Sequence, residues 1–243
     1  MLSVNNHRHQ RYQEITQIMH FQFILFDAIG TTIQDTNANG SLILKSFQQA
    51  FSQHGIVTEK AQLNQQRGKR KREAINTILK EVNLNTELTN SIYHSFLELL
   101  NNNASAFTEV PKASEVFETL RAKGIKIGIG SGLPLSFMQT LITQLNWRAK
   151  DFDYIGSSDD LSAGRPNPIM ILEAMQQLDI TNPTEVLKLG DTKVDILEGK
   201  NANVQTAFVK TGTQKIDTIL PLQPNYIFDS VADLIPLLGM KKQ

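Results

Sequence analysis

The sequence predicts an α/β fold that consists of a parallel sheet and an inserted all-helical segment. Three observations support this fold class. Short apolar strands alternate with amphipathic helices after residue 111, which is typical of a parallel sheet that is covered on both faces. A further apolar strand at 21–26 precedes them. Between the two parts, residues 41–106 contain three helical patterns and no strand pattern.

The composition fits one globular core with a smaller insert. The chain has 243 residues, of which 40% are hydrophobic and 20% are charged, and these ordinary values exclude wholesale disorder. The 24 basic and 24 acidic residues give a formal net charge of zero, so no nucleic-acid partner is expected. Because the sequence has no cysteine, disulfides, thiolate metal sites and cysteine nucleophiles are excluded.

Residues 1–20 form a polar segment, which we expect to be a solvated N-terminal extension. It carries His7, His9 and His20, and metal binding by these histidines is the less favoured alternative. No apolar run approaches the ~20 residues that span a bilayer, and the run at 23–26 is too short for the core of a signal peptide. We therefore expect a cytoplasmic protein that has no membrane partner.

Three helices are expected in the insert that follows the strand at 21–26. Gly55 is a suitable C-cap for the first helix, whose apolar positions recur at helical spacing: Leu42, Ile43, Phe47, Ala50 and Phe51. The second pattern runs through 74–79 and the third through 92–100. The insert is therefore expected to be helical throughout.

Strands and helices alternate in the rest of the chain. We expect helices at 113–123, 134–145, 167–178, from 194 and at 231–238, and strands at 125–129, 152–155, 186–189, 206–209 and 226–228. Ligands of such sheets bind at the carboxyl ends of the strands. The residues that follow the strands are therefore the first candidates for a functional site.

Polar residues follow three of the predicted strands. Asp27 follows the first strand, Ser131 lies in a Gly-Ser-Gly turn after the strand at 125–129, and Asp191 follows the strand at 186–189. Asp195 comes one helical turn later, and Arg165 lies in a loop between the last two strand ends. Because parallel strands bring their carboxyl ends to one edge, these side chains could together hold a phosphoryl group beside a hard cation.

Each residue type suits a step of phosphoryl transfer. Asp27 and Asp191 offer the oxygen ligands that Mg²⁺ prefers, and the ion would offset the repulsion between an attacking carboxylate and an anionic phosphoryl group. The Gly-Ser-Gly turn would present backbone N–H groups and the Ser131 hydroxyl to phosphate oxygens. Arg165 would add a charge-assisted contact. Asp27 would be the nucleophile, forming an acyl phosphate that water hydrolyses.

Each of these residues also has a simpler structural interpretation. Asp27 can be a helix N-cap or a turn former, and Asp195 can be a solvent-facing or capping residue. The Gly-Ser-Gly sequence can be a turn alone, and Arg165 can be a surface residue. Their occurrence together after successive strands favours the phosphoryl-transfer interpretation.

Three ordered motifs carry a resemblance to a known family. They are Phe26-Asp27-Ala28-Ile29-Gly30-Thr31-Thr32, Gly130-Ser131-Gly132 and Gly190-Asp191-Thr192-Lys193-Val194-Asp195. They resemble the motifs of the haloacid dehalogenase (HAD) superfamily, whose members are Mg²⁺-dependent hydrolases with an aspartyl nucleophile. The resemblance implies a Rossmann-like HAD core domain over 21–36 and 107–243, with a mobile helical cap domain over 37–106.

A finer resemblance is to the phosphonatase-like branch of that superfamily. It rests on Asp27-x-x-Gly30-Thr31-Thr32, on Ala163-Gly164-Arg165-Pro166-Asn167-Pro168, and on Asp191 with the following Asp195-Ile196-x-Glu198-Gly199-x-Asn201-Ala202. The resemblance implies that the metal ion is held by the Asp27 carboxylate, the Ile29 backbone carbonyl and Asp191, with Asp195 supporting that site. It also implies that Ser131, Gly132 and Arg165 hold the phosphate.

Ile29 stands where most phosphomonoesterases of the superfamily have a second Asp, and it cannot protonate a leaving group. Phosphonatase-like proteins also lack this acid. Their aldehyde substrate condenses with a lysine of the cap, and the imine accepts the electrons when the C–P bond breaks. Lys71, three residues after Gly68, takes this place by position. The chain departs from the branch at Arg67 and Ala74, where the branch has Met and His.

The lysine must be neutral to attack, so its pKa has to be lowered by burial or by nearby cations. The expected cations are Lys69, Arg70 and Arg72. Two alternatives for residues 67–72 are a solvated basic start of a helix and an isolated nucleic-acid patch.

Three functions remain open at this stage. The favoured one is a Mg²⁺-dependent HAD-type hydrolase that cleaves a small phosphonate through Asp27, with Lys71 as the imine-forming lysine. The second is a phosphatase that acts on small organophosphates without the usual second Asp. The third is a phosphate-binding module without turnover. Cap helices often pair in this superfamily, so a homodimer through the cap is a further expectation.

Overall fold

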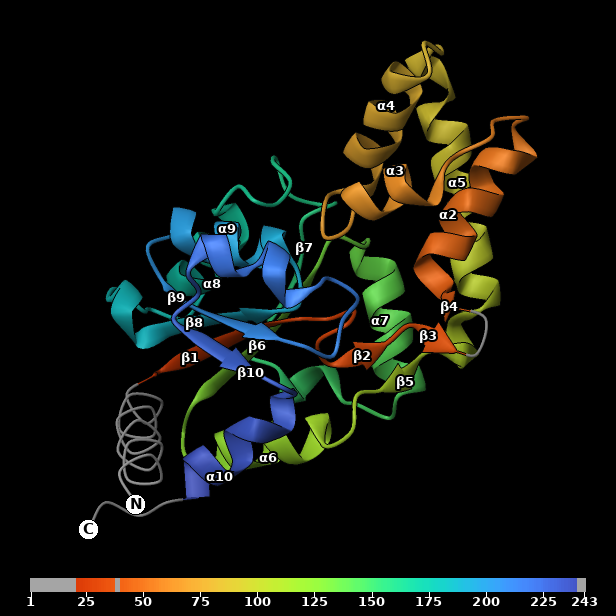
Figure 1. Ribbon diagram of the computed structural model, residues 1–243. Coiled ribbons are helices and arrows are strands. Elements are labelled where there is room, and N and C mark those ends of the chain that lie inside the picture. Colours follow the sequence, from red (N-terminus) through yellow and green to blue (C-terminus); the bar gives the residue numbers. More distant parts are fainter. Residues whose placement is uncertain (1–20, 38–39, 240–243) are drawn as a thin grey trace, which may run out of the picture.

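The computed structural model describes residues 21–37 and 40–239 (Figure 1). The N-terminal segment with His7, His9 and His20 lies outside the described residues. Within the described part of the chain, no helix has the length and apolar character needed to cross a membrane.

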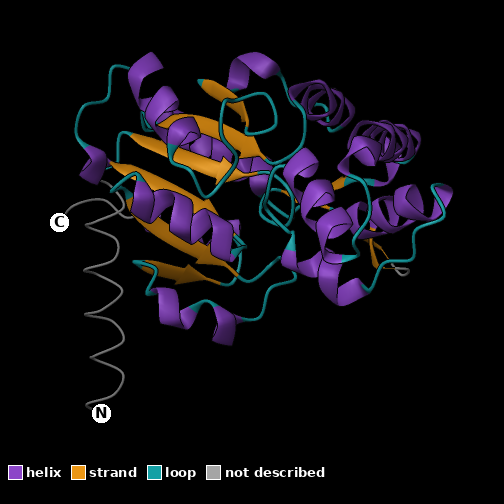
Figure 2. Ribbon diagram, turned by 90° about the horizontal axis from the view of Figure 1, so that it is seen from above, coloured by secondary structure: helices purple, strands orange, loops and turns teal. Residues whose placement is uncertain are grey.

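Six strands form one parallel sheet in the order β10-β9-β8-β1-β6-β7. They are β1 (Phe23–Asp27), β6 (Lys126–Ser131), β7 (Tyr154–Ser157), β8 (Val186–Gly190), β9 (Gln205–Val209) and β10 (Tyr226–Phe228). Each pair of neighbours is parallel. The central strand β1 is buried along its whole length, because helices cover both faces of the sheet (Figure 2). The predicted α/β class with a parallel sheet is confirmed.

Alternate residues of β1 pack against different helices. Ile24 and Phe26 belong to the same apolar cluster as Phe117, which lies on α6 (Ala113–Ala122). Leu25 belongs to a second cluster with Met170, which lies on α8 (Ile169–Gln177). This alternation follows from the period of two residues in a strand. The remaining helices around the sheet are α7 (Leu135–Gln144), α9 (Lys193–Asn201) and α10 (Leu234–Gly239).

A separate group of helices, here called the helical layer, lies between β1 and α6 in the sequence. It consists of α2 (Leu42–Gln53), α3 (Lys60–Gln65), α4 (Lys71–Glu81) and α5 (Thr89–Asn102). Among these, α2 and α4 both pack against α5. In Figure 1 the strands of the sheet point their carboxyl ends toward this layer. The layer therefore stands over the edge of the sheet where ligands of parallel α/β folds bind.

Short strands mark the passage between the sheet and the helical layer. Strand β2 (Ile33–Gln34) pairs antiparallel with β5 (Thr108–Glu109), so the outgoing and returning chain segments run side by side. Strand β3 (Thr36–Asn37) pairs with β4 (Gly40–Ser41) in a small hairpin. Ser41 then caps α2 by accepting a hydrogen bond from the Leu44 N–H. This hairpin is an addition to the purely helical insert that the sequence predicts.

Candidate active site

Most of the predicted site residues line one pocket at the carboxyl edge of the sheet. Asp27 ends β1, Ser131 ends β6, and Asp191 directly follows β8. The lining residues are Asp27, Ile29, Ile43, Arg67, Gly68, Lys71, Ser131, Gly132, Leu133, Arg165, Asp191 and Thr192. Of the predicted residues, only Asp195 is absent from this lining. It lies beneath the pocket, fully buried in the first turn of α9.

Three carboxylates form a tight cluster in this site. Asp27, Asp191 and Asp195 each present an oxygen within 4.8 Å of the other two, and all three residues are buried. Burial raises the pKa of the Asp27 carboxyl, and the neighbouring Asp195 charge raises it further. Burial also raises the pKa of Asp191 well above its ordinary value, with added repulsion from Asp27 and Asp195. The raised pKa values mean that Asp27 and Asp191 are harder to ionise in this site than in water.

The donor set of this cluster fits a divalent cation. Carboxylate oxygens are the ligands of hard ions such as Mg²⁺, and a cation would offset the like-charge repulsion. The backbone at Gly212 packs directly against the Asp191 carboxylate, because a Cβ added at Gly212 would lie 1.8 Å from Asp191 Oδ2. Thr31 fixes the other oxygen by donating from Oγ1 to Asp191 Oδ1 over 3.2 Å. The aspartate cluster could therefore hold a metal ion in a preformed position.

Arg165 links two of the carboxylates. Its Nη1 lies 2.6 Å from Asp27 Oδ1 and 2.9 Å from Asp195 Oδ1, and all three side chains are buried. Arg165 is thus a site residue, and the surface alternative for it is wrong. Asp195 also caps α9, since Asp195 Oδ2 accepts hydrogen bonds from the backbone N–H and the hydroxyl of Thr192. Capping and ion pairing are combined in this one carboxylate.

The sequence interpretation missed two buried charges behind Asp195. Lys188 Nζ lies 3.1 Å from Asp195 Oδ1 and 3.6 Å from Glu198 Oε2. Although burial raises the pKa of a carboxyl, Lys188 and Arg165 hold the pKa of Asp195 below its ordinary value. Burial raises the pKa of Glu198 to about 7. The available signal was a lysine inside the otherwise apolar strand 186–189, because a buried lysine requires acidic partners.

Lys71 is buried at the start of α4, with 6% of its surface exposed. Its Nζ donates to the Lys69 carbonyl oxygen over 2.9 Å. Burial lowers the pKa of the Lys71 amine from 10.5 to about 8, and the charges of Arg165 and Arg67 lower it further, against the opposing effect of Asp159 and Asp27. The leading cause is therefore desolvation, and the cations that lower the pKa most are Arg165 and Arg67, not the expected Lys69, Arg70 and Arg72. Because Lys71 is buried, the alternative that residues 67–72 form a solvated start of a helix is wrong for this residue.

The helical layer is seated closely on the strand ends. A Cβ added at Gly132 would lie 2.6 Å from the Lys69 backbone oxygen, which leaves room only for glycine. Arg70 Nη2 donates to the Asp159 carbonyl over 3.2 Å, and the Tyr93 hydroxyl donates to the Asp159 carboxylate. The pocket that remains has a volume of about 40 Å³.

A parallel sheet with this buried aspartate cluster at its carboxyl edge, covered by a helical insert, is the architecture of a HAD-type hydrolase. A family model described as haloacid dehalogenase-like hydrolase matches residues 24–209. The chain therefore belongs to the haloacid dehalogenase-like hydrolase family. The matched range contains every predicted site residue, and the predicted resemblance and hydrolase class are confirmed.

Relatives with specific names agree with this assignment. Pyrophosphatase PpaX of Oceanobacillus iheyensis is 29% identical over 221 residues, which cover 91% of this chain and 98% of the relative. Phosphonoacetaldehyde hydrolase of Bacteroides fragilis is 28% identical over 184 residues, 70% of each chain. A solved structure of a phosphonoacetaldehyde hydrolase-like protein from Oleispira antarctica has a TM-score of 0.77 at 22% identity, covering 91% of this chain and 96% of that one. The last similarity concerns the fold alone.

Proposed function

We propose that this hydrolase is Mg²⁺-dependent and cleaves the C–P bond of a small phosphonate, with Asp27 as nucleophile and Lys71 as imine-forming lysine. The observation that carries the proposal is the position of Lys71. Its buried amine lines the same pocket as Asp27, and its pKa is lowered to about 8. A lysine in this state provides neutral amine near pH 7, as imine formation requires.

The remaining residues hold the phosphoryl group and the ion. Ser131, Gly132 and Arg165 would bind the phosphonate oxygens, since all three line the pocket beside Asp27. Asp27, the Ile29 carbonyl and Asp191 would hold Mg²⁺, with Asp195 fixed beneath them by Arg165 and Lys188. The bound ion would supply Lewis-acid stabilisation of the phosphoryl charge.

The chemical steps balance with these residues and water, which supplies the protons. The neutral Lys71 amine adds to the aldehyde carbon and water is lost, which forms an imine. The imine nitrogen takes up a proton from water. An Asp27 oxygen then attacks phosphorus while the C–P bond breaks, and the electron pair of that bond moves into the protonated imine to give an enamine. The enamine takes a proton on carbon and is hydrolysed, which frees Lys71. Water then hydrolyses the acyl phosphate, releasing phosphate and regenerating Asp27.

We further propose that residues 37–106 act as a cap. The contacts of Gly132 with Lys69 and of Asp159 with Arg70 and Tyr93 support a closed state, from which the cap would open to admit substrate. Such opening often limits turnover in enzymes with lids. A homodimer through this layer and a cytoplasmic location remain predictions.

A phosphatase is the second candidate. Pyrophosphatase PpaX aligns with 91% of this chain, and Ile29, which lines the pocket, offers no acid for a leaving oxygen. The loss of a general acid slows hydrolysis by ~10²–10⁴-fold. A phosphatase of this design would therefore prefer esters with good leaving groups, and its turnover would not depend on Lys71.

The test is phosphate release from phosphonoacetaldehyde with Mg²⁺, in the presence and absence of borohydride. We expect release that borohydride abolishes, together with a reduced adduct that mass spectrometry places on Lys71. The exposed Lys80 on the same helix serves as control, because Lys80→Met should keep both release and adduct. Release from esters but not from the aldehyde would favour the phosphatase. Binding of phosphorylated ligands without any Asp27-dependent release would leave only a binding module.

A further inference from the structure

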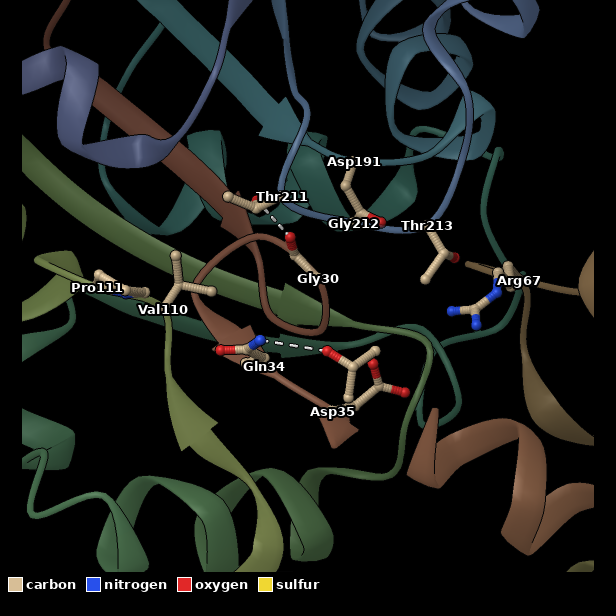
Figure 3. A pocket seen from close by; sticks show the side chains of 11 residues that line it. Gly30, Gln34, Asp35, Arg67, Val110, Pro111, Asp191, Thr211, Gly212 and Thr213 are labelled. Atoms are coloured by element: carbon tan, nitrogen blue, oxygen red, sulfur yellow. Dashed lines mark hydrogen bonds between the residues drawn. The ribbon is translucent and has the colours of Figure 1, made fainter. Parts of the chain in front are cut away.

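A second cavity, of about 190 Å³, adjoins the catalytic pocket beyond Asp191 (Figure 3). Its walls come from the segment after β1, from the turn before α4 and from the loop after β9. Arg67 and Asp191 line both the cavity and the catalytic pocket. The two spaces therefore meet at Arg67, four residues before Lys71 in the sequence. The proposed function leaves this cavity and Arg67 without a role.

Arg67 is a half-buried cation without an anionic partner in the described part of the chain. Its Nε donates to Asn64 Oδ1 over 3.1 Å, which fixes the plane of the guanidinium. Figure 3 shows that the guanidinium is turned toward the Gly212–Thr213 loop across the cavity. Its positive charge also acts on two residues of the catalytic pocket, because it lowers the pKa of Lys71 and that of Asp191. A partly desolvated guanidinium in this position favours an anionic ligand.

The other polar groups that line the cavity do not pair with Arg67 in place of an anionic ligand. Asp35 lies in the wall, but its Oδ2 accepts from the Ser41 hydroxyl and from the Ile43 N–H. Gln34 donates to Thr36 Oγ1 over 3.2 Å. Thr213 lines the cavity and is an exposed residue, so its hydroxyl is available as a second donor.

We infer that Arg67, assisted by Thr213, binds a second anionic group that the substrate carries on its leaving portion. The inference rests on the proposed function. A carbonyl carbon bound to Lys71 bears the phosphonomethyl group and one further substituent, which is only hydrogen in an aldehyde. The adjoining cavity provides the space, and Arg67 the charge, for a carboxylate or a second phosphoryl group at that place. The substrate class is therefore a phosphonate with a second anionic group.

Matched ligand pairs that undergo no turnover test this inference by isothermal titration calorimetry with Mg²⁺. One pair is phosphonoacetate and its apolar isostere isobutylphosphonate, and the other is methylenediphosphonate and methylphosphonate. A charge-assisted hydrogen bond corresponds to roughly a tenfold or larger gain in affinity, and we expect this gain for the member with the second anionic group. The pair with the larger gain identifies carboxylate or phosphoryl as the second group.

Three variants test whether Arg67 causes this preference for a second anionic group. Arg67→Met should abolish it, and Thr213→Val, on the opposite wall, should reduce it even if Arg67→Met fails to fold. Lys80→Met, which removes the same charge from an exposed position of the helical layer, should leave it unchanged. Equal affinities within both pairs, or a preference that survives Arg67→Met, would overturn the inference.

The outcomes separate this inference from the proposed function. Asp27-dependent phosphate release without any preference within the ligand pairs would remove the second anion site and leave the proposed function intact. A preference that depends on Arg67, without release from any substrate, would remove the proposed turnover and leave a binding site for ligands with two anionic groups.

Discussion

Lys71 shows how burial sets the chemistry of a single residue and also costs stability. Its pKa is lowered from 10.5 to about 8, a difference that corresponds to about 3 kcal/mol. The unfolded chain binds this proton more tightly than the folded one, so the free energy of unfolding rises with pH between about 8 and 10.5. Below pH 8 the full penalty is present in the folded protein.

Replacement of Lys71 should therefore stabilise the protein. We expect Lys71→Met to raise the free energy of unfolding at pH 7 by about 1–3 kcal/mol, less than the full penalty because the bond to the Lys69 carbonyl is lost. The gain should shrink as the pH rises toward 10.5. Urea unfolding at pH 7 and pH 10 measures both values. Lys80→Met is the control, and a gain that does not change with pH would contradict the explanation.

The same pKa predicts the pH dependence of the reaction. If neutral Lys71 attacks the carbonyl, kcat/KM for phosphonoacetaldehyde should rise with pH and level off above about 8. Hydrolysis of an aryl phosphate by the same protein needs no imine and should lack this limb. Initial rates of phosphate release between pH 6 and 9.5 provide the comparison. Parallel profiles for the two substrates would show that Lys71 is not the titrating group.

The sequence predicts the site at the residue scale wherever a strand end or a motif marks the residue. Asp27, Ser131 and Asp191 follow buried strands, so their convergence could be inferred from topology. The pairing of Arg165 with Asp27 and Asp195 could not, because Arg165 lies on a loop whose path only tertiary packing sets. For the same reason the partners of buried Lys188 are visible only in the folded chain.

The larger elements are predicted well and the small ones poorly. Each predicted strand of the sheet is present, since its apolar run packs into the core; only the edge strand β10 exposes an apolar residue of that run, Ile227. Helix α3 (Lys60–Gln65) was not predicted, because it is short and buries only Leu63. Strand β7 begins two residues later than the predicted 152–155, because Phe152 packs among Phe117 and Trp147 and does not join the sheet. Aromatic packing outweighs strand periodicity there.

The contact between the helical layer and the sheet edge gives a prediction at the scale of elements. Gly132→Ala would place a Cβ 2.6 Å from the Lys69 backbone oxygen, and only displacement of one element from the other relieves this clash. We expect kcat/KM to fall by roughly 10²-fold, as misplacement by about 1 Å can cause. The melting temperature should also fall, because one apolar cluster runs from the sheet into the helical layer and a displacement disturbs its packing.

Gly132→Ala keeps the backbone N–H that is proposed to bind phosphate, so a loss of activity would not reflect a missing donor. Gly132 also has no positive φ, so alanine adds no backbone strain. Steady-state kinetics and thermal unfolding of the same preparation measure both effects. Unchanged kcat/KM would show that close seating of the layer is not needed for turnover.

At the scale of the whole molecule, binding of a metal ion to the aspartate cluster would be coupled to folding stability. The chain is neutral overall, yet Asp27, Asp191 and Asp195 gather in one buried place. A cation that binds only the folded state at 100 times its dissociation constant contributes about 2.7 kcal/mol, which corresponds to about 5–10 °C in a chain of this size. We expect Mg²⁺ to raise the melting temperature by this amount, and EDTA to reverse the gain.

Asp191→Asn separates this coupling from a general salt effect. Burial and two neighbouring carboxylates hold the pKa of Asp191 well above its ordinary value, so the neutral amide should stabilise the metal-free protein. The same change removes a proposed ligand, so the response to Mg²⁺ should disappear. The variant should thus melt above the metal-free wild type and below, or level with, the wild type in saturating Mg²⁺. Differential scanning fluorimetry over a Mg²⁺ series measures both shifts, and an equal response of the two proteins would place the ion elsewhere.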